Sequence, residues 1–360
     1  MTIPVLAALS MAGAMGVFIV SWGLIRRIYK LPTPAHERHA AATSDGWELA
    51  LYRYLPPGGA RPGREPVILC HGMLSNRFNV DLDARTSLAR YLSSRGFDAW
   101  VMELRGHGGS RRAKGAGQRP FDWNLDDYIR RDIPAVIDAV RDRAGADRVH
   151  WFGHSMGGML LYAYCSLDGS TRAFKSAVLT DAPASFTPMR GRGGVSLGRL
   201  YGRLIPAVPP ALVLPFLGPT VWIFPRVMSR RYGLADRRTL MPLLANAIIP
   251  WGSSRVLLQL CDILESGRFL ASDGSIDYEK GAGRVDFPLL VLSSARKLMD
   301  ERMVRDGYER STSTHKKYIR FSRENGYAID YTHSNFLLAH SSPAEVFPAI
   351  AEWFEAHSSA

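Results

Sequence analysis

Residues 149–158 read VHWFGHSMGG and contain the pattern G-x-S-x-G around Ser155. The run at residues 148–152 predicts a short strand before the serine, and the residues after it predict a helix. A serine on a sharp strand-to-helix turn is typical of a nucleophile elbow. Gly153 and Gly157 permit such a turn and the close packing of helix on strand. The stretch therefore predicts a catalytic nucleophile rather than a glycine-rich structural turn.

Strand and helix patterns alternate on both sides of this turn. The expected strands are at residues 67–70, 98–103, 148–152, 177–180, 289–292 and 318–321, and the expected helices are at 82–95, 125–140, 156–167 and 344–356. A hairpin at residues 43–54 precedes them, with the turn residues Ser44, Asp45 and Gly46 at its tip. The repeated β-α-β order predicts an α/β fold with a mostly parallel central sheet and helices on both of its faces.

Residues 183–285 interrupt this alternation and are rich in proline and large apolar residues. A segment of this length exceeds an ordinary loop, so we expect it to contain helices of its own. Because it lies between two predicted strands, we interpret it as a lid or cap over the carboxyl ends of the strands, where ligands bind in open α/β sheets. The expected organisation is one α/β domain at residues 36–360 that carries residues 183–285 as an insertion.

The N-terminal residues 3–25 contain no charged residue. As a helix they would extend about 34 Å, enough to cross a hydrocarbon core of roughly 30 Å. Arg26, Arg27 and Lys30 follow the apolar run, and no basic residue precedes it. We therefore expect an uncleaved transmembrane anchor at residues 1–30, with the rest of the chain in the cytoplasm. A cleaved secretory signal with an unusual leading region is the alternative.

The composition narrows the classes of partner. The formal net charge is +12, but the chain has no recognition helix, zinc finger or RNA-binding strand pattern, so we expect anionic lipid rather than nucleic acid nearby. The three cysteines lie far apart without C-x-x-C spacing, which argues against a zinc site or a disulfide framework. No H-E-x-x-H or clustered carboxylate pattern is present, so we expect neither a metal nor a cofactor.

Two backbone N–H groups are the candidates for an oxyanion hole. Met156, at the start of the helix after Ser155, is expected to supply one of them. The other is expected from the loop after the strand at residues 67–70, and Met73 is the candidate there. His71, in the same loop, is interpreted as a structural histidine that bonds its own loop.

The general base is expected after the serine in chain order. His333 lies between the last predicted strand and the last predicted helix, which is the favoured position. His315 and His340 are the alternatives.

These motifs resemble those of the α/β-hydrolase superfamily and, within it, the branch of the acid lipases, the gastric and lysosomal lipases. TSDGWELALYR is similar to the opening hairpin of that branch, HGMLSN to its oxyanion loop, VHWFGHSMGG to its elbow and YTHSNFLLAHSSPAEVFPAIAEW to its histidine segment. The resemblance covers about residues 43–183 and 287–353. It implies the α/β-hydrolase fold and hydrolysis of carboxylic esters, usually of apolar acyl chains.

The resemblance also implies a third catalytic residue, an acid just after the penultimate strand, and here the sequence departs from the pattern. Arg296 or Lys297 occupies that place, where a cation would oppose the stabilisation of an imidazolium. Asp300 and Asp181 are the two candidates for the acid, and the sequence does not choose between them. Asp300 also fits the N-cap of a helix that begins at Glu301, and Asp181 also fits a carboxylate that orders its own loop.

The function that we expect is a membrane-anchored serine esterase or lipase acting on lipid-like esters. Ser155 would attack the ester carbonyl while His333 takes its proton, and water would release the acid from the acyl-enzyme. One alternative is an acyltransferase on the same site, which a water-excluding lid would favour. The other is a catalytically weak or inactive lipid-binding or interaction protein, for which the basic residues at the acid position argue.

Overall fold

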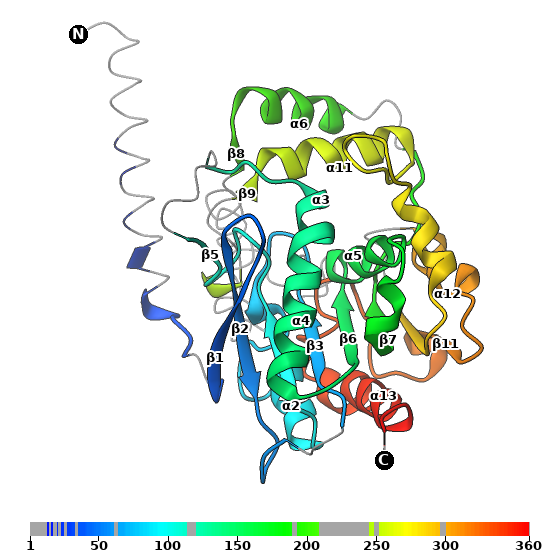
Figure 1. The fold of residues 1–360 in the computed structure, drawn as a ribbon. Helices are drawn as coiled ribbons and strands as arrows, with labels where there is room; N and C mark the ends of the chain where they lie inside the picture. The colour runs from blue at the N-terminus through cyan, green and yellow to red at the C-terminus, as the bar shows by residue number, and fades with distance from the viewer. Residues whose placement is uncertain are drawn as a thin grey trace, which may run out of the picture.

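The computed structural model describes residues 27–32, 35–60, 64–113, 120–188, 193–208, 245–247, 252–295 and 300–359, together with residues 13, 16, 20, 23 and 24. Within these ranges the chain forms a twisted sheet with helices on both faces (Figure 1). The expected α/β fold class is confirmed.

The central sheet has nine strands among the described residues. Their order is β1 (Glu37–Ala42), β2 (Trp47–Tyr54), β4 (Ala99–Met102), β3 (Val67–Cys70), β6 (Val149–His154), β7 (Phe174–Thr180), β10 (Leu289–Ser294) and β11 (Lys316–Phe321), with β5 (Arg111–Arg112) paired to β2. The pairs β1–β2, β2–β4 and β2–β5 are antiparallel, whereas every pair from β4 to β11 is parallel. The predicted strands and the opening hairpin are therefore present.

Burial on both faces explains why the central strands are apolar without interruption. In β3 all four residues are buried, and Ile68 and Cys70 contact one core cluster while Val67 and Leu69 contact the other. Successive side chains of a strand point to opposite faces, so a strand covered on both sides needs apolar residues at every position.

Two sets of helices cover these faces. The helical elements are η1 (Arg77–Asn79), α2 (Leu88–Ser94), α3 (Leu125–Asp127), η2 (Tyr128–Asp132), α4 (Ile133–Ala144), α5 (Met156–Cys165), η3 (Ser170–Ala173), η5 (Tyr278–Arg284), α12 (Glu301–Arg310), η6 (Arg323–Asn325) and α13 (Ser342–Ala356). Apolar residues of α4, α5 and α12 pack in one core cluster, and those of α2 and α13 pack in the other.

One predicted helix begins later than expected. The pattern indicated a helix from residue 82, but α2 begins at Leu88 after the N-cap Ser87, whose side chain accepts a hydrogen bond from the Arg90 N–H. Before it, the Asp83 carboxylate accepts from the N–H groups of Arg85 and Thr86 (2.8 and 2.9 Å). Short polar side chains that bond nearby N–H groups stabilise turns in place of helix.

The inserted segment contains helices, as expected. Its described elements are α6 (Gly193–Leu204), β8 (Ala207–Val208), β9 (Gly252–Ser253), α11 (Ser254–Ser266) and, at its end, η5. Helices α6 and α11 lie side by side beyond the end of the sheet at which β6 leads into α5, and Arg199 of α6 pairs with Asp262 of α11 (2.6 Å) (Figure 1). Residues 189–192, 209–244 and 248–251 lie outside the described residues. The function of the segment as a lid, like its boundaries, stays a prediction.

The predicted membrane anchor at residues 1–30 lies mostly outside the described residues. In the part of the chain that the structure describes, no helix is both long enough and apolar enough to span a bilayer. The end of this segment is attached to the domain through Asn246, which accepts from the Leu31 N–H (3.1 Å) and donates from Nδ2 to the Tyr29 carbonyl (2.7 Å).

A buried ion cluster around Arg105 joins three parts of the fold. The Arg105 side chain, only 1% exposed, donates from Nε to Asp132 Oδ1 (2.8 Å) and from Nη1 to Asp45 Oδ2 (2.7 Å). The Arg105 N–H also donates to Asp132 Oδ2 (2.9 Å). Asp45 belongs to the turn of the β1–β2 hairpin, Arg105 to the loop after β4 and Asp132 to the end of η2, so the cluster holds these three parts together.

We expect Arg105→Met to lower the free energy of unfolding by about 3–5 kcal/mol, because the change leaves the buried Asp132 carboxylate without its cation. The matched control is Arg111→Met, since Arg111 pairs with Glu48 on the exposed surface and should matter little. Urea unfolding of both variants checks this expectation. Equal losses in the two variants would contradict the importance of the buried cluster.

Candidate active site

Ser155 lies on a strained turn between β6 and α5. Its backbone has φ 54° and ψ −117°, a conformation that is rare outside glycine and costly for a side-chain-bearing residue. The Ser155 N–H donates to the Thr180 carbonyl (2.9 Å), and the Ser155 carbonyl accepts from Gly158 and Met159 (both 3.0 Å). This is the strand-turn-helix geometry of a nucleophile elbow.

Three glycines permit this turn because no side chain fits at their positions. A Cβ on Gly153 would lie 2.7 Å from the Gly157 carbonyl oxygen. One on Gly157 would lie 2.5 Å from the Cys70 carbonyl oxygen, and one on Gly158 would lie 2.4 Å from the Ala182 Cβ. The start of α5 therefore presses directly on the ends of β3 and β6, as the sequence predicted.

The loop after β3 passes directly beside the serine. A Cβ on Gly72 would lie 3.4 Å from the Ser155 Cβ, so the backbone that leads into Met73 borders the nucleophile. The Gly72 N–H donates to Asn79 Oδ1 (3.0 Å), which fixes the loop. The Met73 N–H has no hydrogen-bond partner among the described residues. The Met156 N–H belongs to the first turn of α5, where N–H groups lack an acceptor within the helix.

His71 is a structural histidine, as the sequence suggested. Its Nε2 accepts from the Leu104 N–H (3.3 Å), so its Nδ1 carries the proton and donates to the Gly72 carbonyl (2.8 Å). Burial lowers the pKa of His71 to about 3, and the ring is therefore neutral. Its hydrogen bonds fix the loop before Met73.

His333 lies on the loop between β11 and α13, and its side chain is only 14% exposed. The loop is tied to the sheet, because the Tyr331 carbonyl accepts from the Ala295 N–H (3.0 Å) just after β10. Thr332 donates from its N–H to Asn335 Oδ1 (2.8 Å), which fixes the turn around His333. His315 precedes β11 and so lies at the opposite end of the parallel sheet from Ser155, while His340 is on the surface.

The structure places Asp181, and not Asp300, beside His333. Asp181 Oδ2 lies 3.4 Å from His333 Nδ1, and Oδ1 accepts from the Ser294 N–H (2.7 Å). Asp181 follows β7, has φ 46° and is buried. Asp300 is exposed and caps α12, where its Oδ1 accepts from the Arg302 N–H (3.1 Å). The basic residues at the usual acid position, Arg296 and Lys297, lie outside the described residues.

One neighbour of His333 was not anticipated from the sequence. The ring of His154 lies against that of His333, with centroids 4.9 Å apart and an angle of 35° between the planes. His154 occupies the first variable position of G-x-S-x-G, a position that the pattern leaves free. The sequence therefore carried no signal for this contact.

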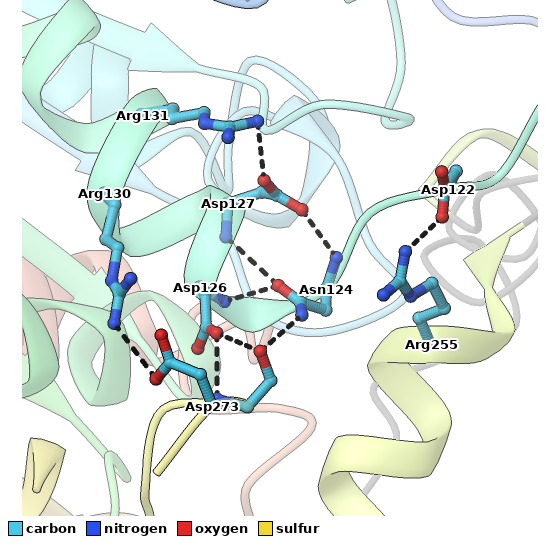
Figure 2. Close-up of a pocket in the computed structure, with 9 residues that line it drawn as sticks. Asp122, Asn124, Asp126, Asp127, Arg130, Arg131, Arg255 and Asp273 are labelled. Atoms are coloured by element: carbon cyan, nitrogen blue, oxygen red, sulfur yellow. Dashed lines mark hydrogen bonds and ion pairs between the residues drawn. The ribbon is translucent and has the colours of Figure 1, made fainter. Parts of the chain in front are cut away.

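A separate pocket of about 360 Å³ lies between the start of α3 and α11 (Figure 2). It is lined by charged and polar residues that are already paired with one another: Asp122 with Arg255, Asn124 with Asp127, Asp127 with Arg131, Asp126 with Ser272 and Arg130 with Asp273. It contains none of the predicted catalytic residues. Among the described residues, no group of three or more His, Cys, Asp or Glu side chains is arranged to hold a metal ion.

Comparison with known proteins identifies the fold. Residues 65–218 match the family model described as the alpha/beta hydrolase fold. A soluble variant of monoglyceride lipase from Saccharomyces cerevisiae superposes with a TM-score of 0.62 at 15% identity, over 92% of this chain and 99% of that one. A putative aryl esterase from Burkholderia cenocepacia superposes with a TM-score of 0.54 at 18% identity, over 89% of this chain and 99% of that one. The chain therefore has the α/β-hydrolase fold.

Part of the sequence is similar to lipases. Triacylglycerol lipase 2 of Arabidopsis thaliana is 33% identical over 163 residues, which are 42% of this chain and 38% of that protein. The gastric triacylglycerol lipase of Mus musculus is 31% identical over 130 residues, which are 34% of this chain and 32% of that protein. The chain matches about a third of the length of these relatives.

Proposed function

We propose that the protein is a serine hydrolase that cleaves carboxylic esters of apolar or lipid-like substrates. The observation that carries the proposal is the contact of His333 Nδ1 with Asp181 Oδ2 (3.4 Å), made at the sheet edge where β6 ends in the strained Ser155 turn. The lipase names of the relatives support the ester as the bond that is cleaved. The loop of Gly72 lies beside Ser155, which supports a catalytic rather than a purely structural role for the turn at Ser155.

Ser155 Oγ attacks the ester carbonyl carbon while His333 removes its proton. The oxygen of the tetrahedral intermediate accepts hydrogen bonds from the N–H groups of Met73 and Met156. His333 then returns the proton to the leaving alcohol, and an acyl-enzyme remains on Ser155. Water, deprotonated by His333, then attacks the acyl carbon. The bond from this carbon to Ser155 Oγ breaks, His333 returns the proton to Ser155 Oγ, and the carboxylic acid leaves.

Asp181 stabilises the imidazolium that forms on His333 in both half-reactions. Its side chain is only 4% exposed, so its charge acts on the ring with little screening by water. The second oxygen is occupied by the Ser294 N–H, which fixes the carboxylate plane. This contact weighs against a catalytically inactive protein, because the charged partner that the usual acid position lacks is present at the end of β7.

The first test is labelling of the serine. We expect a fluorophosphonate probe to label the wild-type chain and not Ser155→Ala, because the probe forms a covalent bond only with an activated serine. His333→Ala should lower both labelling and turnover of p-nitrophenyl esters by about 10⁴-fold or more. No labelling of the wild type, under conditions that label an ordinary esterase, would refute the proposed function.

The second test separates the two candidate acids. We expect Asp181→Asn to lower kcat for ester hydrolysis by about 10⁴-fold, because an amide neither fixes the tautomer of His333 nor stabilises its charge. Asp300→Asn should change little, since Asn caps a helix as well as Asp does. A selective loss in Asp300→Asn would transfer the role to that residue, and an unchanged Asp181→Asn enzyme would contradict our assignment.

We also propose that residues 1–30 anchor the protein in a membrane, with the catalytic domain on the cytoplasmic side. The uncharged run at residues 3–25 and the basic residues after it support this proposal. Exposed Leu197, Leu200 and Leu204 on α6 would suit a domain that works close to lipid.

Membrane attachment is tested by fractionation. We expect the full chain to sediment with membranes, to resist extraction by high salt and to dissolve in detergent, because an inserted apolar helix is not held by charge. A chain that lacks residues 1–30 should lose this resistance to salt. A full-length chain that stays in the soluble fraction would contradict the anchor.

A further inference from the structure

His154 is fixed at the carboxyl end of β6, one residue before Ser155. It pairs with Thr180 in the register of β6 and β7, and its Nδ1 lies 2.9 Å from Thr180 Oγ1. The side chain is buried, with 6% of the residue exposed. A ring held by a strand and by a hydroxyl group on the neighbouring strand has little freedom to rotate.

The same ring contacts two parts of the proposed catalytic apparatus. Its centroid is 4.9 Å from that of His333. Its Cδ2 atom lies 3.3 Å from the position that a Cβ on Gly72 would occupy, so it also borders the loop that leads into Met73. His154 therefore packs against both the proposed base, His333, and the loop of Gly72 that leads to the proposed oxyanion donor Met73.

We propose that His154 is a positioning residue for His333: its ring, fixed by Thr180, packs against the imidazole of His333, holds that ring towards Asp181 and excludes water from the covered face. The inference rests on the proposed function, because it concerns the same Ser155 and His333. A misplaced base loses rate, since proton transfer requires the reacting groups within hydrogen-bond reach.

The charge of His154 suits this position. Burial, together with a smaller effect of the neighbouring His333, lowers the pKa of His154 to about 3, so the ring is neutral near pH 7. The titratable groups that face His154 are His333 and, at the end of β7, Asp181. His71 on the adjacent loop packs against His107 instead. Of these groups, the carboxylate of Asp181 therefore lies beside the imidazolium formed on His333, and the neutral ring of His154 adds no second positive charge.

The chain contains a matched control on the same strand. His150 is buried in β6, its Nδ1 lies 2.8 Å from Ser176 Oγ on β7, and burial lowers its pKa to about 3. Its ring contacts Phe97 and Phe354 instead of a catalytic residue. A change at His150 therefore reproduces the loss of a buried, hydroxyl-bonded histidine without touching His333.

The experiment compares His154→Ala, His154→Gln, His154→Phe and His150→Ala in the full chain. Glutamine retains a polar group for Thr180 but no ring, and phenylalanine retains a ring. The measurements are kcat, KM and the pH profile of kcat/KM for a p-nitrophenyl ester, the rate of fluorophosphonate labelling, and the urea midpoint of unfolding.

We expect both ring-less variants at position 154 to lose kcat by about 10- to 100-fold, with KM within about twofold of wild type. Their acid limb of kcat/KM should move to higher pH, because water that enters the vacated face stabilises the charged form of His333. His154→Phe should have its acid limb of kcat/KM at the wild-type pH and should retain most of the wild-type kcat, because the phenyl ring still covers His333. His150→Ala should lower the urea midpoint but leave kcat and the limb unchanged.

The outcomes separate this inference from the proposed function. Suppose that the probe labels the wild type but the acid limb of kcat/KM does not move in His154→Ala and His154→Gln. This result would leave the proposed function intact and overturn the positioning role. A loss of kcat in His150→Ala as large as that in His154→Ala would also overturn it, since instability would then explain both. An unlabelled wild type would overturn the proposed function and this inference together.

Discussion

The close contact between the start of α5 and the end of β3 is the constraint on which the site depends. A side chain at Gly157 would meet the Cys70 carbonyl at 2.5 Å, so only glycine lets the helix approach the strand. This approach puts the first N–H groups of α5 beside the loop that begins at His71. It also imposes the positive φ of Ser155, a strain on the order of 1–3 kcal/mol that the buried strands on both sides maintain.

The position of Asp181 follows from the topology of the sheet. Strands β7 and β10 are parallel neighbours, so their carboxyl ends lie side by side under the loop of His333. The Asp181 carboxylate spans the two ends, since it accepts from Ser294 at the end of β10 and approaches His333 with its other oxygen. A carboxylate at the end of either strand can therefore serve one histidine, and the acid need not follow β10.

The strands and the elbow could be predicted because their physical requirements leave a direct mark on the sequence. A strand buried on both faces must be apolar throughout, as β3 is, and a helix pressed on a strand needs glycine where the two touch, as at Gly157. The start of α2 could not be predicted from the apolar periodicity, because the side chains of Asp83 and Ser87 bond nearby N–H groups and delay the helix to Leu88. The choice between Asp181 and Asp300 could not either, since both follow strands and only distance in the fold separates them. The contact of His154 with His333 could not be predicted, because the G-x-S-x-G pattern allows any residue at position 154.

The loop that carries the proposed oxyanion donor is held from two sides. From the core, the buried Glu103 accepts from the Arg77 N–H (3.1 Å), and the neutral His71 donates to Gly72. From outside, Asn76 donates to the carbonyl of Asn246 (2.6 Å), and the Asn246 side chain bonds Tyr29 and Leu31 at the end of the N-terminal segment. Donors that stabilise a transition state must be fixed before the charge develops. Hydrogen bonds thus connect the N-terminal and inserted segments directly to the backbone whose rigidity the proposed chemistry requires.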